Sequence, residues 1–192
     1  MEDPIALFEE WFAEAQAAGE PEAEGMTLAT CSPKTRQPTA RIVLYRGLSD
    51  GGFRFFTNYR SHKGDELAEN AHAALVFWFR TLGRQVRVEG LVEKLSAEES
   101  DAYFAARPRG HQIGAWASDQ SQIVEGRAVL EARFAEAEAR FVGKDVPRPP
   151  HWGGYRVRPE VIELWAGRED RMHERRRFTR DGSGWRREIL SP

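Results

Sequence analysis

Basic side chains recur at alternate positions within residues 163–178. Arg171, His173 and Arg175 follow an apolar run that ends in Trp165. On an extended strand alternate residues point to one side, so the spacing predicts two guanidinium groups and an imidazole on one face. That face suits an anionic, planar ligand, because arginine offers a fixed fork of donors and histidine exchanges a proton near neutrality. The alternative is a solvated basic edge strand, since lysine and arginine commonly protect sheet edges.

Three further segments combine basic and polar side chains. One runs from Arg41 to Arg46, with a charge at each end of an otherwise apolar strand. In residues 57–63, hydroxyl groups, free N–H groups, a helix dipole and a lysine converge at a predicted strand-to-helix junction, as they commonly do around phosphate. Residues 103–121 form the third segment. Each segment alone also fits an ordinary structural role, but four of them in a chain of formal net charge −2 favour local anion binding.

Composition and motifs exclude several classes of function. A formal net charge of −2 gives no overall field that favours nucleic acid or an anionic membrane. Cys31 is the single cysteine, which excludes an internal disulfide and a cysteine-rich metal site, and the five histidines lack metal-ligand spacing. There is no nucleophile elbow or phosphate-loop motif, so an enzyme of this sequence would rely on an organic cofactor. The sequence contains no signal-peptide pattern and no apolar run of membrane-spanning length, so a cytoplasmic protein is predicted.

Hydrophobic periodicity and turn residues predict the elements that position these side chains. Asp3-Pro4 indicates the start of a helix that ends at Gly19, and further helices are predicted over residues 61–70, 96–106 and 121–141. Strands are predicted over residues 26–31, 39–46, 53–57, 73–79, 85–94, 155–157, 161–165, 175–179 and 185–189. Because the helices come in blocks, the pattern favours a mainly β (α+β) fold, an antiparallel barrel with peripheral helices. No linker or repeat divides the chain, so residues 1–192 are expected to form one domain.

Taken together, these segments resemble the pyridoxine/pyridoxamine 5′-phosphate oxidase family, nearly from end to end. The most specific motif is Arg-x-His-Asp/Glu-Arg after a strand that ends in Trp, which here is residues 171–175. The other motifs that carry the resemblance are RIVL (41–44), FTN (56–58), SHK (61–63), RQV (84–86), YF and RPR (103–104 and 107–109), QIGAW (112–116), QS (120–121) and WGG (152–154).

The resemblance implies a split antiparallel β-barrel that forms a homodimer, with FMN at an active site between the subunits. It implies oxidation of pyridoxamine 5′-phosphate or pyridoxine 5′-phosphate to pyridoxal 5′-phosphate, with O2 as acceptor and H2O2 as by-product. By position, FMN would be surrounded by Arg41, Ile42, Val43, Leu44, Phe56, Thr57, His62, Lys63, Gln85, Gln120, Ser121, Trp165 and Arg175. The substrate phosphate would be held by Arg46, Tyr103, Arg107 and His111. Arg171 and His173 would lie over the substrate ring, beside the carbon that gives up hydride, and no metal is implied.

Three positions depart from the pattern of the family, which usually has Lys at Arg46, Arg at His62 and Ser at His111. His62 removes a permanent charge from the expected FMN phosphate site, so weaker or pH-dependent affinity is expected. The chain also begins almost at its first helix, without the basic N-terminal segment that covers the substrate in longer relatives. Two alternatives stay open: a related flavin oxidase acting on another aromatic metabolite, as in the phenazine-forming relatives, and a non-catalytic protein that binds FMN or pyridoxal phosphate.

Overall fold

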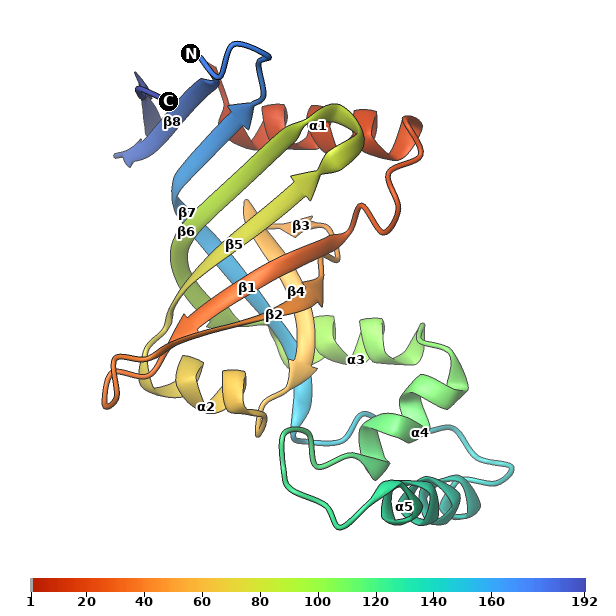
Figure 1. The fold of residues 1–192 in the computed structure, drawn as a ribbon. Coiled ribbons are helices and arrows are strands. Elements are labelled where there is room, and N and C mark those ends of the chain that lie inside the picture. The colour runs from red at the N-terminus through yellow and green to blue at the C-terminus, as the bar shows by residue number, and fades with distance from the viewer. Residues whose placement is uncertain (1) are drawn as a thin grey trace.

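The computed structural model describes residues 2–192, in which one antiparallel sheet takes strands from almost the whole chain. The strands are β1 (Gly25–Cys31), β2 (Pro38–Leu44), β3 (Leu48–Ser49), β4 (Gly52–Asn58), β5 (His72–Phe79), β6 (Arg84–Lys94), β7 (Trp152–Ala166), β8 (Glu174–Asp181) and β9 (Gly184–Ile189). Their hydrogen-bonded order is β2-β1-β5-β6-β7-β4-β3, and the β8–β9 hairpin pairs with β7. The sheet curls until β2 and β4 lie side by side without pairing (Figure 1). The predicted split barrel with peripheral helices is confirmed.

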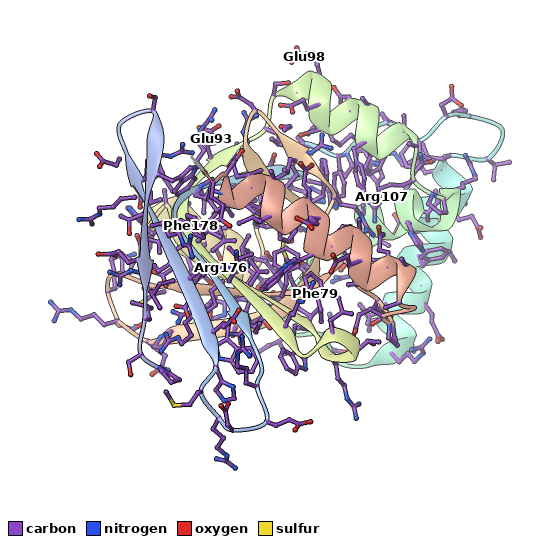
Figure 2. All side chains as sticks on the ribbon, turned by 90° about the horizontal axis from the view of Figure 1, so that it is seen from above. Phe79, Glu93, Glu98, Arg107, Arg176 and Phe178 are labelled. Carbon is purple, nitrogen blue, oxygen red and sulfur yellow. The ribbon has the colours of Figure 1, made fainter. Side chains whose placement is uncertain are left out.

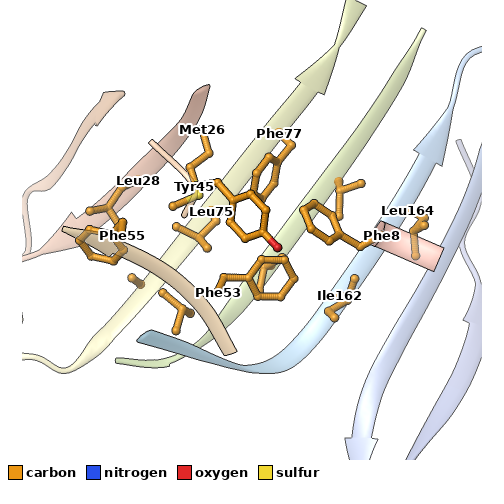
Figure 3. Packing of buried hydrophobic residues seen from close by; sticks show 14 of the residues in the cluster. Phe8, Met26, Leu28, Tyr45, Phe53, Phe55, Leu75, Phe77, Ile162 and Leu164 are labelled. Atoms are coloured by element: carbon orange, nitrogen blue, oxygen red, sulfur yellow. The ribbon is translucent and has the colours of Figure 1, made fainter. Parts of the chain in front are cut away.

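Aromatic side chains fill the barrel and fix helix α1 (Pro4–Ala17) against it. Asp3 caps this helix by accepting a hydrogen bond from the N–H of Ile5 at 3.0 Å, and Pro4 takes the first helical position. The ring of Phe8 lies 4.8 Å, centre to centre, from both Phe53 and Phe77 (Figure 3). Rings at such separations attract beyond their simple burial. The apolar face of α1 therefore covers the barrel core.

Strand β7 is a correction to the prediction of two separate strands over residues 155–157 and 161–165. It runs unbroken from Trp152 to Ala166, because a bulge at Glu160 follows Pro159 and accommodates the proline, which cannot donate to a ladder. The register with β6 shifts between Glu89 and Gly90. A Cβ on Gly90 would lie 1.9 Å from the carbonyl oxygen of Arg158, so this close approach requires glycine. The single long strand β7 therefore extends from one end of the barrel to the other (Figure 1).

Helices α2 (His62–Glu69), α3 (Ala97–Ala105), α4 (Arg109–Ala117) and α5 (Arg127–Arg140) lie outside the barrel, together with the short 3-10 helix η1 (Arg80–Leu82). Helices α3 to α5 gather near one end of the molecule (Figure 1). The predicted helix over residues 121–141 is wrong at its start, and α4 was not predicted. Residues 118–126 form an irregular strap instead, in which Ser121 has a φ of 72° and the side chain of Ile123 is fully exposed. The helical periodicity had counted Ile123 as an apolar position of a packed helix.

The described residues contain no helix that is both long and apolar enough to cross a membrane. Within the same residues there is also no group of His, Cys, Asp and Glu side chains that could hold a metal ion.

Candidate active site

A cleft of about 1250 Å³ opens where strand β2, the end of β4, the start of α2, helices α3 and α4 and the strap 118–126 meet. It collects most of the predicted site residues: Arg41, Ile42, Val43, Leu44, Arg46, Phe56, Thr57, His62, Lys63, Tyr103, Arg107, His111, Gln120 and Ser121. These residues are spread over some eighty positions of the chain. The fold therefore brings three of the four basic segments into one place.

Lys63 occupies one corner of the cleft, which we call the α2 corner, in the first turn of α2. Its Nζ donates to Gln120 Oε1 at 2.9 Å, to Thr57 Oγ1 at 3.1 Å and to Ser61 Oγ at 3.2 Å. Burial, and then the nearby charge of Arg41, lower the pKa of Lys63 to about 8. A half-buried ammonium beside a helix N-terminus with hydroxyl groups around it is a setting for an anion.

Glu66 lies behind this corner and is almost fully buried, with an exposed fraction of 3%. Its Oε2 accepts hydrogen bonds from the hydroxyls of Thr30 and Thr39, each at 2.6 Å, and from Arg41 Nη2 at 3.3 Å. Its Oε1 lies 3.6 Å from His62 Nε2. Burial alone would raise the pKa of Glu66, but the two hydroxyl bonds and the charges of His62 and Arg41 lower it overall. The Glu66 carboxylate, which does not line the cleft, thus contacts both Arg41 and His62, which do.

Tyr103 and Arg107 form a second polar corner, the α3 corner, at the end of helix α3. Arg46 Nε donates to Tyr103 Oη at 2.7 Å, which leaves the Tyr103 proton free to be donated elsewhere. The ring of Tyr103 stacks on Phe56 with 3.8 Å between centres and 9° between planes. Arg107 lies beside α3 and α4, away from the β8 residues Arg176 and Phe178 (Figure 2). Its Nη1 is buried and has no hydrogen-bond partner among residues 2–192.

An apolar wall also lines the cleft. Ile42 and Leu44 of β2 keep exposed fractions of 67% and 42%, although both are large hydrophobic residues. They alternate along β2 with the half-buried Arg41 and Val43, which point to the other side. A cleft with an exposed apolar wall and two cationic corners can hold a planar ring that carries an anionic group.

Five predicted site residues do not line the cleft: Gln85, Trp165, Arg171, His173 and Arg175. Gln85, Trp165 and Arg175 lie in one row across β6, β7 and β8, because the register pairs Trp165 with both of the others. The ring of His173 lies 4.6 Å from that of Trp165. These five residues form a second group, with Gln85, Trp165 and Arg175 on the β6–β7–β8 face of the sheet and Arg171 and His173 in the connection that precedes β8.

The expected alternation of residues 171–175 on one strand is wrong for Arg171 and His173. Strand β8 begins at Glu174, and the residues before it form a connection held by local hydrogen bonds. Asp170 Oδ1 accepts from the N–H of Met172 at 3.0 Å, and His173 Nδ1 accepts from the N–H of Arg168 at 3.1 Å. Such side-chain bonds to the backbone compete with the strand ladder. Arg171 has a φ of 62°, which no strand residue adopts.

Arg175 is the member of this motif that lies on a strand, and it is held by its own chain. Its Nε donates to Glu163 Oε1 at 2.8 Å, and its Nη1 donates to the carbonyl oxygen of Ser191 at 3.0 Å. The bond to Glu163 and its charge raise the pKa of Arg175. Glu163 is itself buried and also accepts from Arg87 Nη1 at 3.4 Å. Arg175 is therefore fixed in place before any ligand arrives.

Comparison with known proteins finds matching family models for both the N-terminal and the C-terminal part of the chain. Residues 12–141 match the family described as pyridoxamine 5′-phosphate oxidase, and residues 152–192 match the pyridoxine 5′-phosphate oxidase C-terminal dimerisation region. The chain belongs to the pyridoxamine 5′-phosphate oxidase family. The predicted family, and with it an enzyme of the oxidoreductase class, is confirmed.

Two curated relatives of the family bear the name pyridoxine/pyridoxamine 5′-phosphate oxidase. The protein from Rubrobacter xylanophilus is 56% identical over 190 residues, 99% of this chain and 87% of the relative. The protein from Burkholderia thailandensis is 55% identical over 193 residues, 99% of this chain and 89% of the relative.

Among solved structures, PhzG from Burkholderia lata, in complex with tetrahydrophenazine-1-carboxylic acid, superposes with a TM-score of 0.94 at 33% identity, over 100% of this chain and 94% of PhzG. A pyridoxamine 5′-phosphate oxidase-related, FMN binding protein from Nostoc punctiforme shares the fold with a TM-score of 0.77 at 18% identity, over 95% of this chain and 96% of its own.

Sequence reasoning missed two buried residues at this cleft: Trp152, which lines it, and Glu66, which lies behind the α2 corner. Glu66 had one available signal, because it lies four residues after His62 on a predicted helix, where side chains meet. Trp152 belongs to a motif that carried the resemblance, but its turn-like neighbours gave no sign that its ring lines the cleft. The roles of the individual site residues, the single domain over residues 1–192 and the cytoplasmic location stay predictions.

Proposed function

We propose that this protein is an FMN-dependent oxidase that converts pyridoxamine 5′-phosphate or pyridoxine 5′-phosphate to pyridoxal 5′-phosphate, within one domain over residues 1–192 of a cytoplasmic protein. The observation that carries the proposal is the cleft with two separate cationic corners and an apolar wall. FMN and the substrate each have one phosphate and one planar ring, so two anion sites beside a ring-sized apolar surface match the pair. The names of the relatives at 55–56% identity support the same substrate class.

The α2 corner suits the phosphate of FMN. Lys63, Thr57 and the N-terminus of α2 offer an ammonium, a hydroxyl and unpaired N–H groups, while Arg41 and His62 add charge from the side held by Glu66. When bound, FMN supplies the redox chemistry, taking two electrons from the substrate carbon and passing them to O2 to give H2O2. Gln120 and Ser121 of the strap lie at the same corner and would close over it.

The α3 corner suits the phosphate of the substrate. Arg107 has a buried donor without a protein partner, and Tyr103 has a free hydroxyl proton, so both can donate to phosphate oxygens. Arg46, where relatives usually have lysine, is engaged with Tyr103 and adds its charge from behind. His111 is exposed at the rim of the cleft and can donate a further hydrogen bond.

The second group of residues is proposed to complete the cleft of a partner subunit in a homodimer. In a two-fold symmetric dimer each subunit gives the same surface and receives the other, so a group missing from one cleft can come from the partner's β6–β7–β8 face. The match of residues 152–192 to a dimerisation region supports this arrangement. Trp165, Gln85 and Arg175 would then contact FMN.

Arg171 and His173 would lie over the substrate. His173 Nδ1 accepts from the backbone, so its neutral ring carries the proton on Nε2 and presents a donor there. The role proposed for both residues is to orient the reacting carbon. Orientation lowers the activation barrier, because the entropy lost on alignment is already lost when the substrate binds.

Purified protein is expected to be yellow, with FMN at about one per subunit, and to consume O2 while it forms pyridoxal 5′-phosphate from pyridoxamine 5′-phosphate. Pyridoxine 5′-phosphate assayed in parallel gives the substrate preference. Colourless protein that does not take up added FMN would refute the flavin assignment. Protein that binds FMN and pyridoxal 5′-phosphate without turnover would instead be a binding protein.

A second candidate is oxidation of a phenazine-type carboxylic acid, because PhzG with its ligand superposes so closely. The α3 corner supports a phosphorylated substrate, because the two charges of Arg46 and Arg107 beside the Tyr103 hydroxyl match a phosphate dianion better than the single charge of a carboxylate. Tetrahydrophenazine-1-carboxylic acid assayed beside pyridoxamine 5′-phosphate separates the two, and a higher kcat/KM for the phenazine would select the second candidate.

The shared site is tested by mixing two inactive variants. Arg107→Ala removes a residue of the cleft and Arg171→Ala removes a residue of the second group. Random exchange of subunits makes half of the dimers mixed, and each mixed dimer has one intact site, so about one quarter of wild-type activity is expected to return. If both groups served the same subunit's site, mixing would restore nothing.

A further inference from the structure

Arg107 lies against an aromatic surface in the α3 corner. Its guanidinium carbon is 4.5 Å from the centre of the Trp152 ring and 5.6 Å from that of Phe104. Cation–ring contacts of this length stabilise a guanidinium, and more so where water is excluded. Because a guanidinium is planar and favours stacking on an aromatic face, such a contact also restricts the direction of its N–H groups.

The ring of Trp152 is buried and packed against other aromatic rings. Only 6% of it is exposed, and its ring is within 12° of parallel to those of Phe56 and Tyr103. Its carbonyl oxygen accepts from Arg148 Nη1 at 2.7 Å, which fixes the start of β7. A Cβ on Gly154 would lie 2.8 Å from the ring of Phe56, so the glycine permits this packing. The ring of Trp152 is thus fixed by its packing beneath the guanidinium of Arg107.

We propose that Trp152 is a positioning residue, which sets the affinity for the phosphate group of the substrate by holding the guanidinium of Arg107, a residue that lines the same cleft, against its ring. The inference rests on the proposed function of the α3 corner. Burial, and the charge of Arg46, lower the pKa of Arg107, so the environment works against the charged group. The face of Trp152 offsets part of this cost and leaves the buried Nη1 unpaired for a phosphate oxygen. Without the ring, the side chain has more rotamers to lose on binding.

The consequence is specific to phosphorylated ligands. Replacement of Trp152 by Leu is expected to raise KM for pyridoxamine 5′-phosphate, and Kd for pyridoxal 5′-phosphate, roughly tenfold, with a much smaller effect on unphosphorylated pyridoxamine. Trp152→Phe keeps a ring under Arg107 and is expected to change KM only about two- to threefold. FMN content is measured for each variant, so that any loss through the stack of Trp152 on Phe56 is separated from the effect on the phosphate of the substrate.

A double-mutant cycle separates positioning from packing. Arg107→Lys keeps a charge but loses the planar stack, so Trp152→Leu added to it is expected to raise Kd less than about twofold further. Trp116→Leu is the matched control, because Trp116 packs in the same cluster and carries Arg140 at 4.6 Å but does not line the cleft. It is expected to lower the melting temperature without shifting the ratio of Kd values for the phosphorylated and unphosphorylated ligands.

An equal rise in Kd with and without Arg107→Lys would overturn the proposal, as would an equal loss of affinity for pyridoxamine and its phosphate. If Trp152→Leu does not fold, Trp152→Met, which is flexible enough to fill an irregular gap but has no ring, takes its place in the cycle. Absence of turnover in the wild-type protein would refute the proposed function alone. Equilibrium binding of pyridoxal 5′-phosphate to the FMN-loaded protein needs no turnover and would still decide the role of Trp152.

Discussion

The affinity for FMN is expected to fall as pH rises through the pKa of Lys63. Burial and Arg41 hold that pKa at about 8 in the free protein. A phosphate dianion beside Nζ favours the ammonium, so binding selects the protonated form and takes up a proton wherever the free amine is present. The apparent Kd then scales as one plus the ratio of neutral to protonated Lys63, provided that the bound lysine stays charged.

The magnitude follows from that pKa. At pH 7 about one molecule in eleven has a neutral Lys63, whereas at pH 9 about ten in eleven do, so Kd is expected to rise about tenfold between these pH values. This corresponds to about 1.4 kcal/mol of binding free energy. The FMN phosphate loses its second proton near pH 6 and so stays a dianion throughout this range.

Titration of the apoprotein with FMN, followed by flavin fluorescence at constant ionic strength from pH 7 to pH 9, measures this slope. Lys63→Arg is the control, because a guanidinium keeps its charge over the whole range, so that only the contribution of His62 to the slope should remain. Equal slopes in wild type and Lys63→Arg would refute the reasoning. The free energy of unfolding of the apoprotein should change with pH in the opposite direction. Between pH 8 and about 10.4 the unfolded chain binds more protons at Lys63 than the folded chain does, so the wild type should gain stability relative to Lys63→Arg as pH rises.

Two further predictions concern single residues. Arg171→Ala is expected to lower turnover by about 100-fold or more if Arg171 orients the reacting carbon. FMN content and melting temperature should stay unchanged, because the Arg171 side chain is exposed. An equal loss of turnover and FMN would show that Arg171 serves the cofactor. Glu66→Ala is expected to cost about 2–4 kcal/mol in urea unfolding, because Thr30, Thr39 and Arg41 lose a buried acceptor. Glu66→Gln, which keeps an acceptor, should cost less, and a change within about 0.5 kcal/mol for Glu66→Ala would contradict the role of this carboxylate.

The α2 corner could be predicted in outline because its signals are local. Ser61 precedes a helical pattern, and its hydroxyl does cap α2, accepting from the N–H of Gly64 at 3.4 Å. The alternation of β2 likewise indicated two faces, and the structure separates Arg41 from Ile42 accordingly. The meeting of Lys63 with Gln120 has no such signal, because an irregular strap without periodicity carries Gln120 across 57 positions of sequence.

Arg171 and His173 show the limit of the periodicity argument most clearly. Alternate spacing predicts a shared face only where the backbone is extended, and Asp170 and His173 use their side chains to bind the backbone instead. Asp170 had that capacity on sequence grounds, since aspartate commonly turns the chain in this way. The chemistry inferred from the motif stays a prediction, whereas the strand that was expected to present Arg171 and His173 is wrong.

The proposed division of the site between two groups would constrain how a dimer works. Arg175 is already bonded to Glu163 and Ser191, and Trp165 is packed between strands, so the second group is organised before assembly. In the cleft, by contrast, Arg107 keeps a buried donor without a partner and Ile42 leaves an apolar surface exposed. Both features cost free energy in an isolated chain and are relieved only by what enters the cleft. We therefore propose that the preorganised β6–β7–β8 face of one subunit closes over the cleft of the other once its ligands are bound. Because Gln85, Trp165 and Arg175 of that face are proposed to contact FMN, dissociation of the dimer and release of FMN should be coupled.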